Sequence, residues 1–163
     1  MAEPARKAVD AGDQIPVHSR RFGDYEVPAD RLLHFPEGLI GFPHARRFAL
    51  LDGTRPDAPF RRLLCVDEPE LGFVVCDPEA LWPGYGSALP PYEGGREHLA
   101  VLALVTIPKN PVEMTANLMA PLVVDCRTRV GRQVVLDTGR FSTRHPVLPP
   151  ADAGATAGGG GTR

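Results

Sequence analysis

Short runs of apolar residues, separated by turns rich in glycine, proline and aspartate, make up most of this chain. Such runs are typical of β-strands, whereas an amphipathic helix repeats its apolar residues roughly every three to four positions over a longer stretch. The run Leu99–Ile107 is continuously apolar and stops at Pro108. Its periodicity alone also fits a helix, but Val105, Thr106 and Ile107 favour a central strand buried on both faces.

The other runs are shorter and bounded by turn signals. Phe60–Val66 and Leu71–Cys76 flank Asp67–Glu70, a pattern that predicts a hairpin with a loop of about four residues. Arg127–Arg132 is predicted to be the loop of a second hairpin, and Pro121 is expected at a sheet edge or a bulge. The remaining predicted strands are Val17–Phe22, Arg31–Phe35, Arg47–Leu51, Thr115–Met119, Pro121–Cys126, Gln133–Leu136 and Phe141–His145.

Helix is predicted to be scarce. The stretch from Pro78 to Gly95 holds too many prolines and glycines for a long helix, so it allows a single turn at Glu79–Trp82. Pro111–Met114 is expected to form a turn. The sequence therefore predicts an all-β, predominantly antiparallel fold: a compact single-domain β-barrel-like or sandwich structure with minimal helix.

The length of 163 residues fits one domain with tails. Residues 1–14 are polar and aperiodic, which predicts a disordered N-terminal arm. Residues 148–163 are rich in glycine, alanine and proline, which predicts a flexible tail. The β domain is therefore expected over residues 15–147. A domain of this size can bury enough surface to fold without disulfides or a structural metal.

Charge and targeting signals narrow the function classes. The net charge is −2, which argues against nonspecific nucleic-acid binding, because such binding depends on clustered lysine and arginine. The N-terminus lacks the apolar core of a secretory signal, and no apolar run is long enough to span a membrane. The chain is therefore predicted to be cytoplasmic, with reduced thiols and no membrane partner.

The three cysteines, Cys65, Cys76 and Cys126, have no CxxC spacing, so they make a poor zinc site and a poor disulfide framework. Symmetric pairing about the predicted Asp67–Glu70 loop is expected to place Cys65 roughly opposite Cys76, close enough for a disulfide if oxidised. The alternative, which we favour, is that both are buried and act as small hydrophobic residues.

Residues that carry catalysis in other proteins are scattered here. The five histidines show no metal-ligand or hydrolytic spacing, although His34, His44 and Asp52 would form a metal site if the fold assembled them. The serines lack the context of a nucleophile, and there is no phosphate-binding loop or dinucleotide fingerprint. The sequence therefore predicts a non-enzymatic protein with no cofactor, no metal and no small-molecule substrate.

A first candidate partner surface is acidic. Residues 67–79 hold five carboxylates and no lysine or arginine. Asp67, Glu68 and Glu70 are either a solvated hairpin tip or a patch that steers a basic partner electrostatically. The dipeptides Arg46-Arg47 and Arg61-Arg62 would partly neutralise the patch if they lay nearby.

A second candidate surface is apolar. Leu39, Ile40 and Phe42 lie among glycine and proline turns, and Trp82 and Tyr85 lie in a Pro/Gly-rich loop. Apolar residues on loops either fold back into the core or serve as aromatic and aliphatic anchors for a partner.

An ordered set of motifs resembles the flagellar assembly factor FliW family. FPEGLIGFP at Phe35–Pro43 looks like that family's N-terminal signature, and PFRRLLCVDEPELGFVVCDP at Pro59–Pro78 is similar to its next block. Ala116, Met119 and Asp125 depart from the family pattern, and residues 79–98 are richer in proline and glycine. The third block, within Met114–Pro146, carries its matches at Thr115, Asn117, Leu118, Ala120, Pro121, Gln133, Leu136, Arg144, His145 and Pro146.

The resemblance implies a compact β-barrel-like regulator without enzymatic activity. Members of the family bind flagellin and the translational regulator CsrA, and their binding relieves CsrA repression of flagellin mRNA translation. The resemblance thus implies two protein partners and no direct contact with nucleic acid. Combined with the two surfaces above, the candidate contact residues are Asp67, Glu68, Glu70, Leu39, Phe42 and Asn117.

Two other functions compete with this one. Arg127, Arg129 and Arg132 fall in one predicted hairpin with Phe and Tyr residues nearby, as in a β-barrel nucleic-acid-binding module. A contiguous basic face would be needed to support it. A small hydrolase or metalloenzyme would need a pocket where histidines and carboxylates converge.

Overall fold

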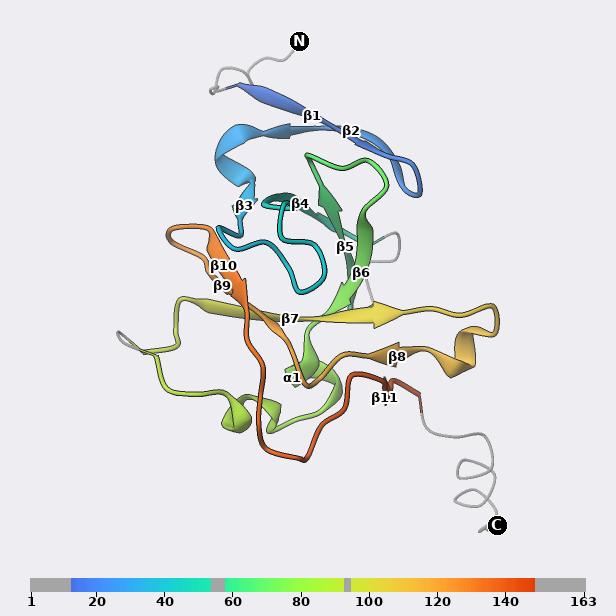
Figure 1. Ribbon diagram of the computed structural model, residues 1–163, viewed down its shortest axis with the longest axis vertical. Helices are drawn as coiled ribbons and strands as arrows, with labels where there is room; N and C mark the ends of the chain where they lie inside the picture. Colours follow the sequence, from blue (N-terminus) through green and yellow to red (C-terminus); the bar gives the residue numbers. More distant parts are fainter. Residues whose placement is uncertain (1–12, 54–57, 93–94, 149–163) are drawn as a thin grey trace.

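The computed structural model describes residues 13–53, 58–92 and 95–148, and nearly all of its regular structure is β (Figure 1). Its helical elements are one short α-helix, α1 (Pro78–Leu81), and the 3-10 turns η2 (Ala29–Arg31), η3 (Tyr85–Ala88) and η4 (Pro111–Glu113). The strands are β1 (Gln14–Ser19), β2 (Gly23–Pro28), β3 (Leu33–His34), β4 (Arg47–Asp52), β5 (Phe60–Cys65), β6 (Gly72–Cys76), β7 (Leu99–Thr106), β8 (Thr115–Ala116), β9 (Leu122–Asp125), β10 (Val130–Gln133) and β11 (His145–Pro146).

The main sheet closes into a barrel. Its strand order runs β7-β6-β5-β4-β3-β10-β9, and β9 pairs back onto β7, which makes a ring of seven strands. The short strands β8 and β11 extend the sheet beyond β7, and every pairing is antiparallel except the single bridge between Val130 of β10 and His34 of β3. The predicted all-β, predominantly antiparallel class is confirmed, and the barrel alternative is the one adopted.

Strand β7 holds this ring together. Its first half, Leu99–Leu102, pairs with β9, whereas Ala103–Val105 pairs with β6. Side chains of β7 alternate between the barrel interior and a second cluster outside it, so both faces lie against apolar residues. This explains why the stretch is continuously apolar, and it confirms the prediction of a central strand.

The barrel interior is filled by inward-facing residues from most of the strands. Phe35 and Phe48 are fully buried there and meet edge to face, with ring centroids 5.5 Å apart. Gly131 of β10 lets the backbone pass close to this pair, because a Cβ atom at that position would lie 2.9 Å from the Phe35 ring. The other members of the interior cluster are Leu33, Leu39, Ala45, Leu63, Cys65, Val75, Leu102, Leu122 and Val124.

Two flanking layers cover parts of the outer face of the barrel. The β1–β2 hairpin packs Val17 and Val27 on Leu64 and Ala49, which point outward from β5 and β4. The segment that includes α1 and η3 packs against another part of the outer face, on β6 and β7. There the hydroxyl of buried Tyr85 donates to the Leu118 carbonyl at 2.6 Å.

Several predicted boundaries were wrong. The strand predicted at Gln133–Leu136 is Val130–Gln133, so the loop predicted at Arg127–Arg132 is shorter, and Arg129 takes the left-handed turn conformation with φ of 63°. The strand predicted at Thr115–Met119 ends at Ala116, because the Asn117 side chain bends the chain by accepting from the Ala120 amide at 3.0 Å. Pro121 lies just before β9 and is buried, where its missing N–H removes no ladder hydrogen bond.

The first strand starts earlier than predicted. Gln14 begins β1, where a strand had been expected over Val17–Phe22, and the carbonyl of Asp13 accepts from the Ala29 amide at 2.9 Å. The rest of the predicted arm and tail, residues 1–12 and 149–163, lies outside the described residues.

The predicted approach of Cys65 and Cys76 was wrong. The β5–β6 register places Cys76 opposite Phe60, and the Cys65 amide donates to the Leu71 carbonyl. Cys65 is the last residue of β5, next to the loop, whereas Cys76 is the last residue of β6, at the end far from the loop. The two thiols therefore lie near opposite ends of the β5–β6 hairpin. Both are free and buried, which confirms the alternative that we favoured.

This arrangement predicts one reactive thiol. Burial raises the pKa of the Cys65 thiol, and it raises that of Cys76 to about 12, so both stay protonated at pH 8. Cys126 is exposed. A disulfide reagent that releases a coloured thiolate is expected to titrate one thiol quickly in the native chain and all three in guanidinium. The variant Cys126→Ser should have no fast phase. A second fast thiol in that variant would contradict the structure.

Candidate functional site

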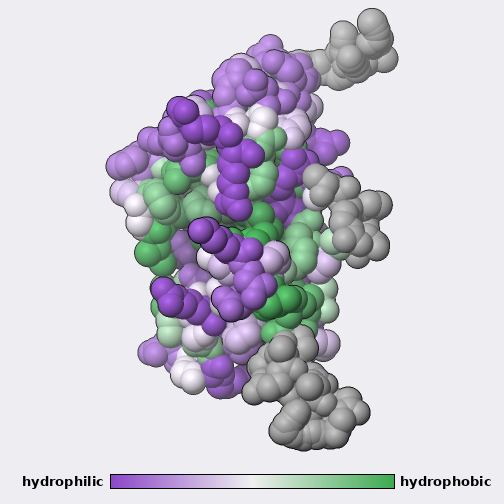
Figure 2. All heavy atoms as spheres, turned by 90° about the vertical axis from the view of Figure 1, so that its right-hand side faces the viewer, coloured by the Kyte–Doolittle hydropathy of each residue, from purple (hydrophilic) through white to green (hydrophobic). Residues whose placement is uncertain are grey.

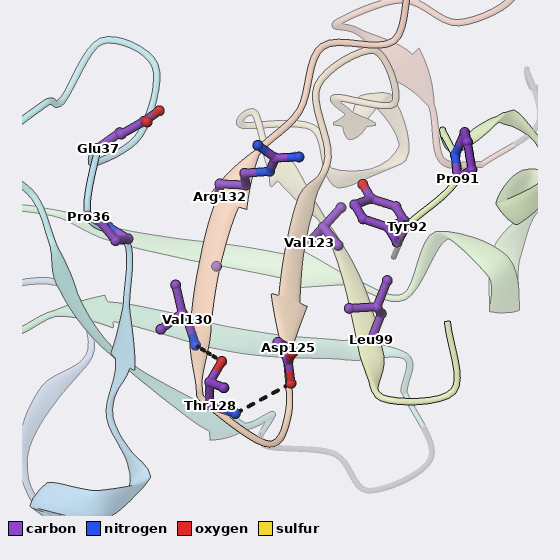
Figure 3. Close-up of a pocket in the computed structure, with 11 residues that line it drawn as sticks. Pro36, Glu37, Pro91, Tyr92, Leu99, Val123, Asp125, Thr128, Val130 and Arg132 are labelled. Atoms are coloured by element: carbon purple, nitrogen blue, oxygen red, sulfur yellow. Dashed lines mark hydrogen bonds between the residues drawn. The ribbon is translucent and has the colours of Figure 1, made fainter. Parts of the chain in front are cut away.

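A cleft of about 540 Å³ lies on the outer face of the β9–β10 hairpin (Figure 3). We call it the β9–β10 cleft. One wall comes from the loop after β3, and the other comes from the segment that precedes β7. The cleft is lined by Pro36, Glu37, Pro91, Tyr92, Leu99, Val123, Asp125, Thr128, Val130, Gly131 and Arg132.

Strand alternation decides which side chains reach the cleft. Leu122 and Val124 of β9 belong to the barrel interior, so Val123 and Asp125 face outward. Figure 3 shows the Tyr92 ring beside Val123, and Val123 is only 4% exposed. The floor of the cleft is therefore apolar and partly covered.

Two polar side chains in the cleft, Arg132 and Tyr92, lie near one another. Figure 3 shows the Arg132 side chain extending from β10 toward the side where Tyr92 lies. The Tyr92 hydroxyl is buried and has no hydrogen-bond partner within the described part of the chain. Burial raises the pKa of Tyr92, although the nearby arginines Arg132 and Arg96 act in the opposite direction. The phenol is therefore a neutral hydrogen-bond group at neutral pH.

Asp125 is engaged in the hairpin turn. Its Oδ1 accepts from the backbone amide of Arg127 at 2.8 Å and from that of Thr128 at 3.4 Å. The hydrogen bond from the Arg127 side chain lowers the Asp125 pKa. This carboxylate is thus ionised and holds the turn, which makes it a poor general base.

A tight turn at Leu39–Phe42 continues the surface beyond the cleft. Leu39 and Phe42 exchange backbone hydrogen bonds of 3.1 and 2.7 Å, and Gly41 between them has φ of 90°. Ile40 at the tip is 61% exposed and Phe42 is 37% exposed. A smaller hollow of about 300 Å³ connects this turn with Arg132 and Gln133.

Gln133 fixes the turn to the barrel. Its Oε1 accepts from the Ile40 amide at 2.8 Å, and its Nε2 donates to the Ala120 carbonyl at 2.9 Å. The exposed apolar tip is therefore held rigidly, which lowers the entropy cost of binding a partner. Sequence reasoning gave no site role to Tyr92 or Gln133, because their neighbours lie far away along the chain. It named Ile40 only within the apolar candidate surface and Arg132 only for the nucleic-acid alternative.

The two apolar residues predicted as partner contacts, Leu39 and Phe42, differ in how far they are buried. Leu39 is 3% exposed and packs in the barrel interior, the core position that was one of the two expectations for the apolar residues of this loop. The side chains of a tight turn diverge, and Leu39 turns inward while Ile40 takes the exposed position. Phe42 is partly exposed, with its ring centroid 6.0 Å from that of Phe73. Asn117 is half-buried and occupied by its hydrogen bond to Ala120.

The predicted acidic turn carries less net charge than its sequence suggests. Asp67 accepts from Arg47 Nε at 3.1 Å and Nη2 at 2.8 Å, and Glu70 lies 2.9 Å from Arg20 Nε. The three carboxylates of the turn thus face two arginines, which leaves about one negative charge, on Glu68. The expected neutralisation does occur, but with Arg20 as the second partner.

The other two carboxylates of residues 67–79 serve the backbone. Asp77 accepts from the Glu79 amide at 3.0 Å and caps α1. Glu79 accepts from the amides of Gly84 and Gly86 at 2.6 and 2.7 Å, and these bonds lower the Glu79 pKa. The acidic sequence run therefore does not form one acidic field.

The described residues contain no group of histidine, cysteine and carboxylate side chains that could hold a metal ion, so His34, His44 and Asp52 are not assembled. The arginines of the β9–β10 hairpin also diverge. Arg127 pairs with Asp125, and Arg129 donates to the Arg31 carbonyl at 2.8 Å. No helix in the described part of the chain is long and apolar enough to cross a membrane.

The fold and this surface define a class: a small β-barrel protein with a partly apolar cleft and an exposed apolar turn on one face. The family described as FliW protein matches residues 16–148. The chain is 31% identical over 143 residues to a flagellar assembly factor FliW of Thermoanaerobacter pseudethanolicus, covering 81% of this chain and 92% of that one. It is 37% identical over 140 residues to a FliW of Bdellovibrio bacteriovorus, covering 81% and 78%.

A crystal structure of the flagellar assembly factor FliW also matches. Its TM-score is 0.73 at 28% sequence identity, and the match covers 83% of this chain and 99% of that chain. The chain belongs to the FliW family of flagellar assembly factors.

The bridging role of Gln133 can be tested directly. Gln133→Ala is expected to lower the free energy of unfolding by about 1–3 kcal/mol, because the Ala120 carbonyl loses its partner and the turn loses its anchor. Hydrogen exchange at the Ile40 amide should become faster. Gln14→Ala, at an exposed position of β1, is the matched control and should change neither quantity. Unchanged exchange at Ile40 would show that Gln133 does not hold the turn.

Proposed function

We propose that this chain binds flagellin and the translational regulator CsrA, and that it thereby relieves CsrA repression of flagellin mRNA translation. Membership of the FliW family supports the role in flagellar assembly. The observation that carries the proposal of protein binding is the rigid apolar turn at Leu39–Phe42 beside the β9–β10 cleft. We assign no catalytic role, since the described polar groups of the cleft are engaged in turns or lie among apolar residues.

Flagellin is the partner that we assign to the apolar turn. Helical protein partners bind by laying an apolar stripe into a groove, with a few anchor residues supplying most of the affinity. Ile40 and Phe42 offer such anchors from the barrel side, and the adjoining hollow offers space for side chains of the partner. Leu39 supports the turn from beneath.

CsrA is the partner that we assign to the acidic turn at Asp67–Glu70. A protein that binds RNA is basic where it meets phosphates, so a nearby negative charge attracts it and repels RNA. Because Asp67 and Glu70 are paired with arginines, Glu68 supplies most of the attraction. We therefore expect a modest steering effect.

Ile40→Asp and Phe42→Ala are expected to weaken binding to purified flagellin monomers by about tenfold or more in calorimetry, the loss typical of a hot-spot residue. Both side chains are partly or largely exposed, so the melting temperature should change little. Val112→Asp is the matched control, since Val112 is 58% exposed and lies on η4, away from the turn. Equal affinity of Ile40→Asp and the control would exclude the turn as the flagellin contact.

Charge reversal tests the acidic turn. Glu68→Lys combined with Glu70→Lys is expected to slow association with CsrA several-fold at low salt and less at high salt. Asp67 is left unchanged because its Oδ1 accepts two hydrogen bonds from the Arg47 side chain, which tie β4 to the turn. Glu97→Lys is the control for an exposed carboxylate elsewhere. If the double variant associates at the wild-type rate at both salt concentrations, the turn does not steer CsrA.

A further inference from the structure

A second groove, of about 440 Å³, lies between the two flanking layers of the barrel, where the outer face of β5, β6 and β7 is left uncovered. We call it the arginine groove. It is separate from the β9–β10 cleft, with which it shares no lining residue. The lining residues that matter most are Arg21, Arg62, Phe22, Phe60 and Ile107.

The groove carries a local positive charge. Arg62 donates to the Asp52 backbone carbonyl at 3.0 and 2.7 Å and to the Tyr25 hydroxyl at 2.6 Å, so its partners are uncharged groups. The side chains of Phe60, Arg62 and Leu64 lie on the outer face of β5, so that of Arg61 points to the opposite face, where it lies 3.8 Å from the Asp52 carboxylate. Among the described residues, Arg21 and Arg62 therefore give the groove a local charge of about +2 on a chain whose overall charge is −2.

The same groove is apolar along its floor. Phe22 and Phe60 are partly buried, and Ile107, at the end of β7, is 40% exposed. Figure 2, which faces the side on which β7 ends, shows hydrophobic residues gathered across the middle of that face, below a hydrophilic upper region. Apolar floor and cationic walls together fit an amphipathic ligand.

Two of the three aromatic rings that line the groove, those of Phe22 and Tyr25, are covered by guanidinium groups. The Arg21 guanidinium lies over the Phe22 ring, 4.8 Å from its centroid, and that of Arg62 lies 5.3 Å from the Tyr25 centroid. Single-stranded nucleic acid binds through open aromatic faces along a continuous basic track. Because guanidinium groups cover the rings of Phe22 and Tyr25, these two rings present no open face to a base. The outward N–H groups of the same guanidinium groups can still donate hydrogen bonds to carboxylates.

We propose that the arginine groove docks an acidic amphipathic helical segment of a partner protein. An apolar side chain of the segment lies against Phe60 and Ile107, and its carboxylates pair with Arg21 and with the remaining N–H groups of Arg62. Arg62 positions the wall through its bonds to the Asp52 carbonyl and Tyr25. The site goes beyond the proposed function, because it uses neither the Leu39–Phe42 turn nor the acidic turn and so leaves room for a third contact.

The test uses the full chain and a synthetic helical peptide with leucines on one face and glutamates on the other, labelled with an uncharged fluorophore. Anisotropy is expected to show micromolar binding that weakens as salt is raised. Arg21→Glu and Ile107→Asp should each weaken it by about tenfold. Arg46→Glu, at an exposed position outside the groove, is the charge control and should bind like the wild type.

Two comparison probes decide between ligand classes. The same peptide with lysine in place of glutamate should not bind, and a thymidine oligonucleotide should bind much more weakly than the acidic peptide. Tighter binding of the oligonucleotide, lost in Arg21→Glu, would assign the groove to nucleic acid instead. Acidic-peptide binding that both groove variants leave intact would overturn the proposal. Neither result depends on flagellin or CsrA binding, which is measured with other variants.

Discussion

The pairing of β7 on both of its edges is the constraint on which the rest of the structure depends. Its first half closes the ring through β9, and its second half continues the sheet through β6. Closure removes the free edges that an open sheet of this length would present. It also forces both faces of β7 to be covered, which is why the chain devotes an uninterrupted apolar run to this strand.

A closed ring of short strands leaves little interior volume, and this limits the residues that line it. Phe35 and Phe48 fill much of that space, and the neighbouring strand β10 approaches them only because residue 131 is a glycine. The outer face must then be covered by pieces that are not part of the ring. The β1–β2 hairpin covers one region, and the segment around α1 and η3 covers another.

The surfaces that we propose for docking lie where this cover stops. The β9–β10 cleft lies over a hairpin that faces solvent, with the Leu39–Phe42 turn held beside it by Gln133. The arginine groove lies between the two flanking layers. The acidic turn, by contrast, is compensated by Arg20 and Arg47, which come from other elements. In this member of the FliW family, rigid apolar surface and uncompensated arginine are therefore more prominent than negative charge.

The sequence by itself determined the strand-rich class, the near absence of helix, the central position of Leu99–Ile107 and the family, because local periodicity, proline and glycine report on a residue's own segment. The order of motifs was informative for the same reason. The sequence by itself could not determine the register that separates Cys65 from Cys76, the inward turn of Leu39 or the start of β10 at Val130. These depend on contacts between residues far apart along the chain, such as the bond from Ile40 to Gln133 and the pairing of Glu70 with Arg20. Only the closed barrel, which fixes those distances, decided which charges are compensated and which apolar residues stay exposed.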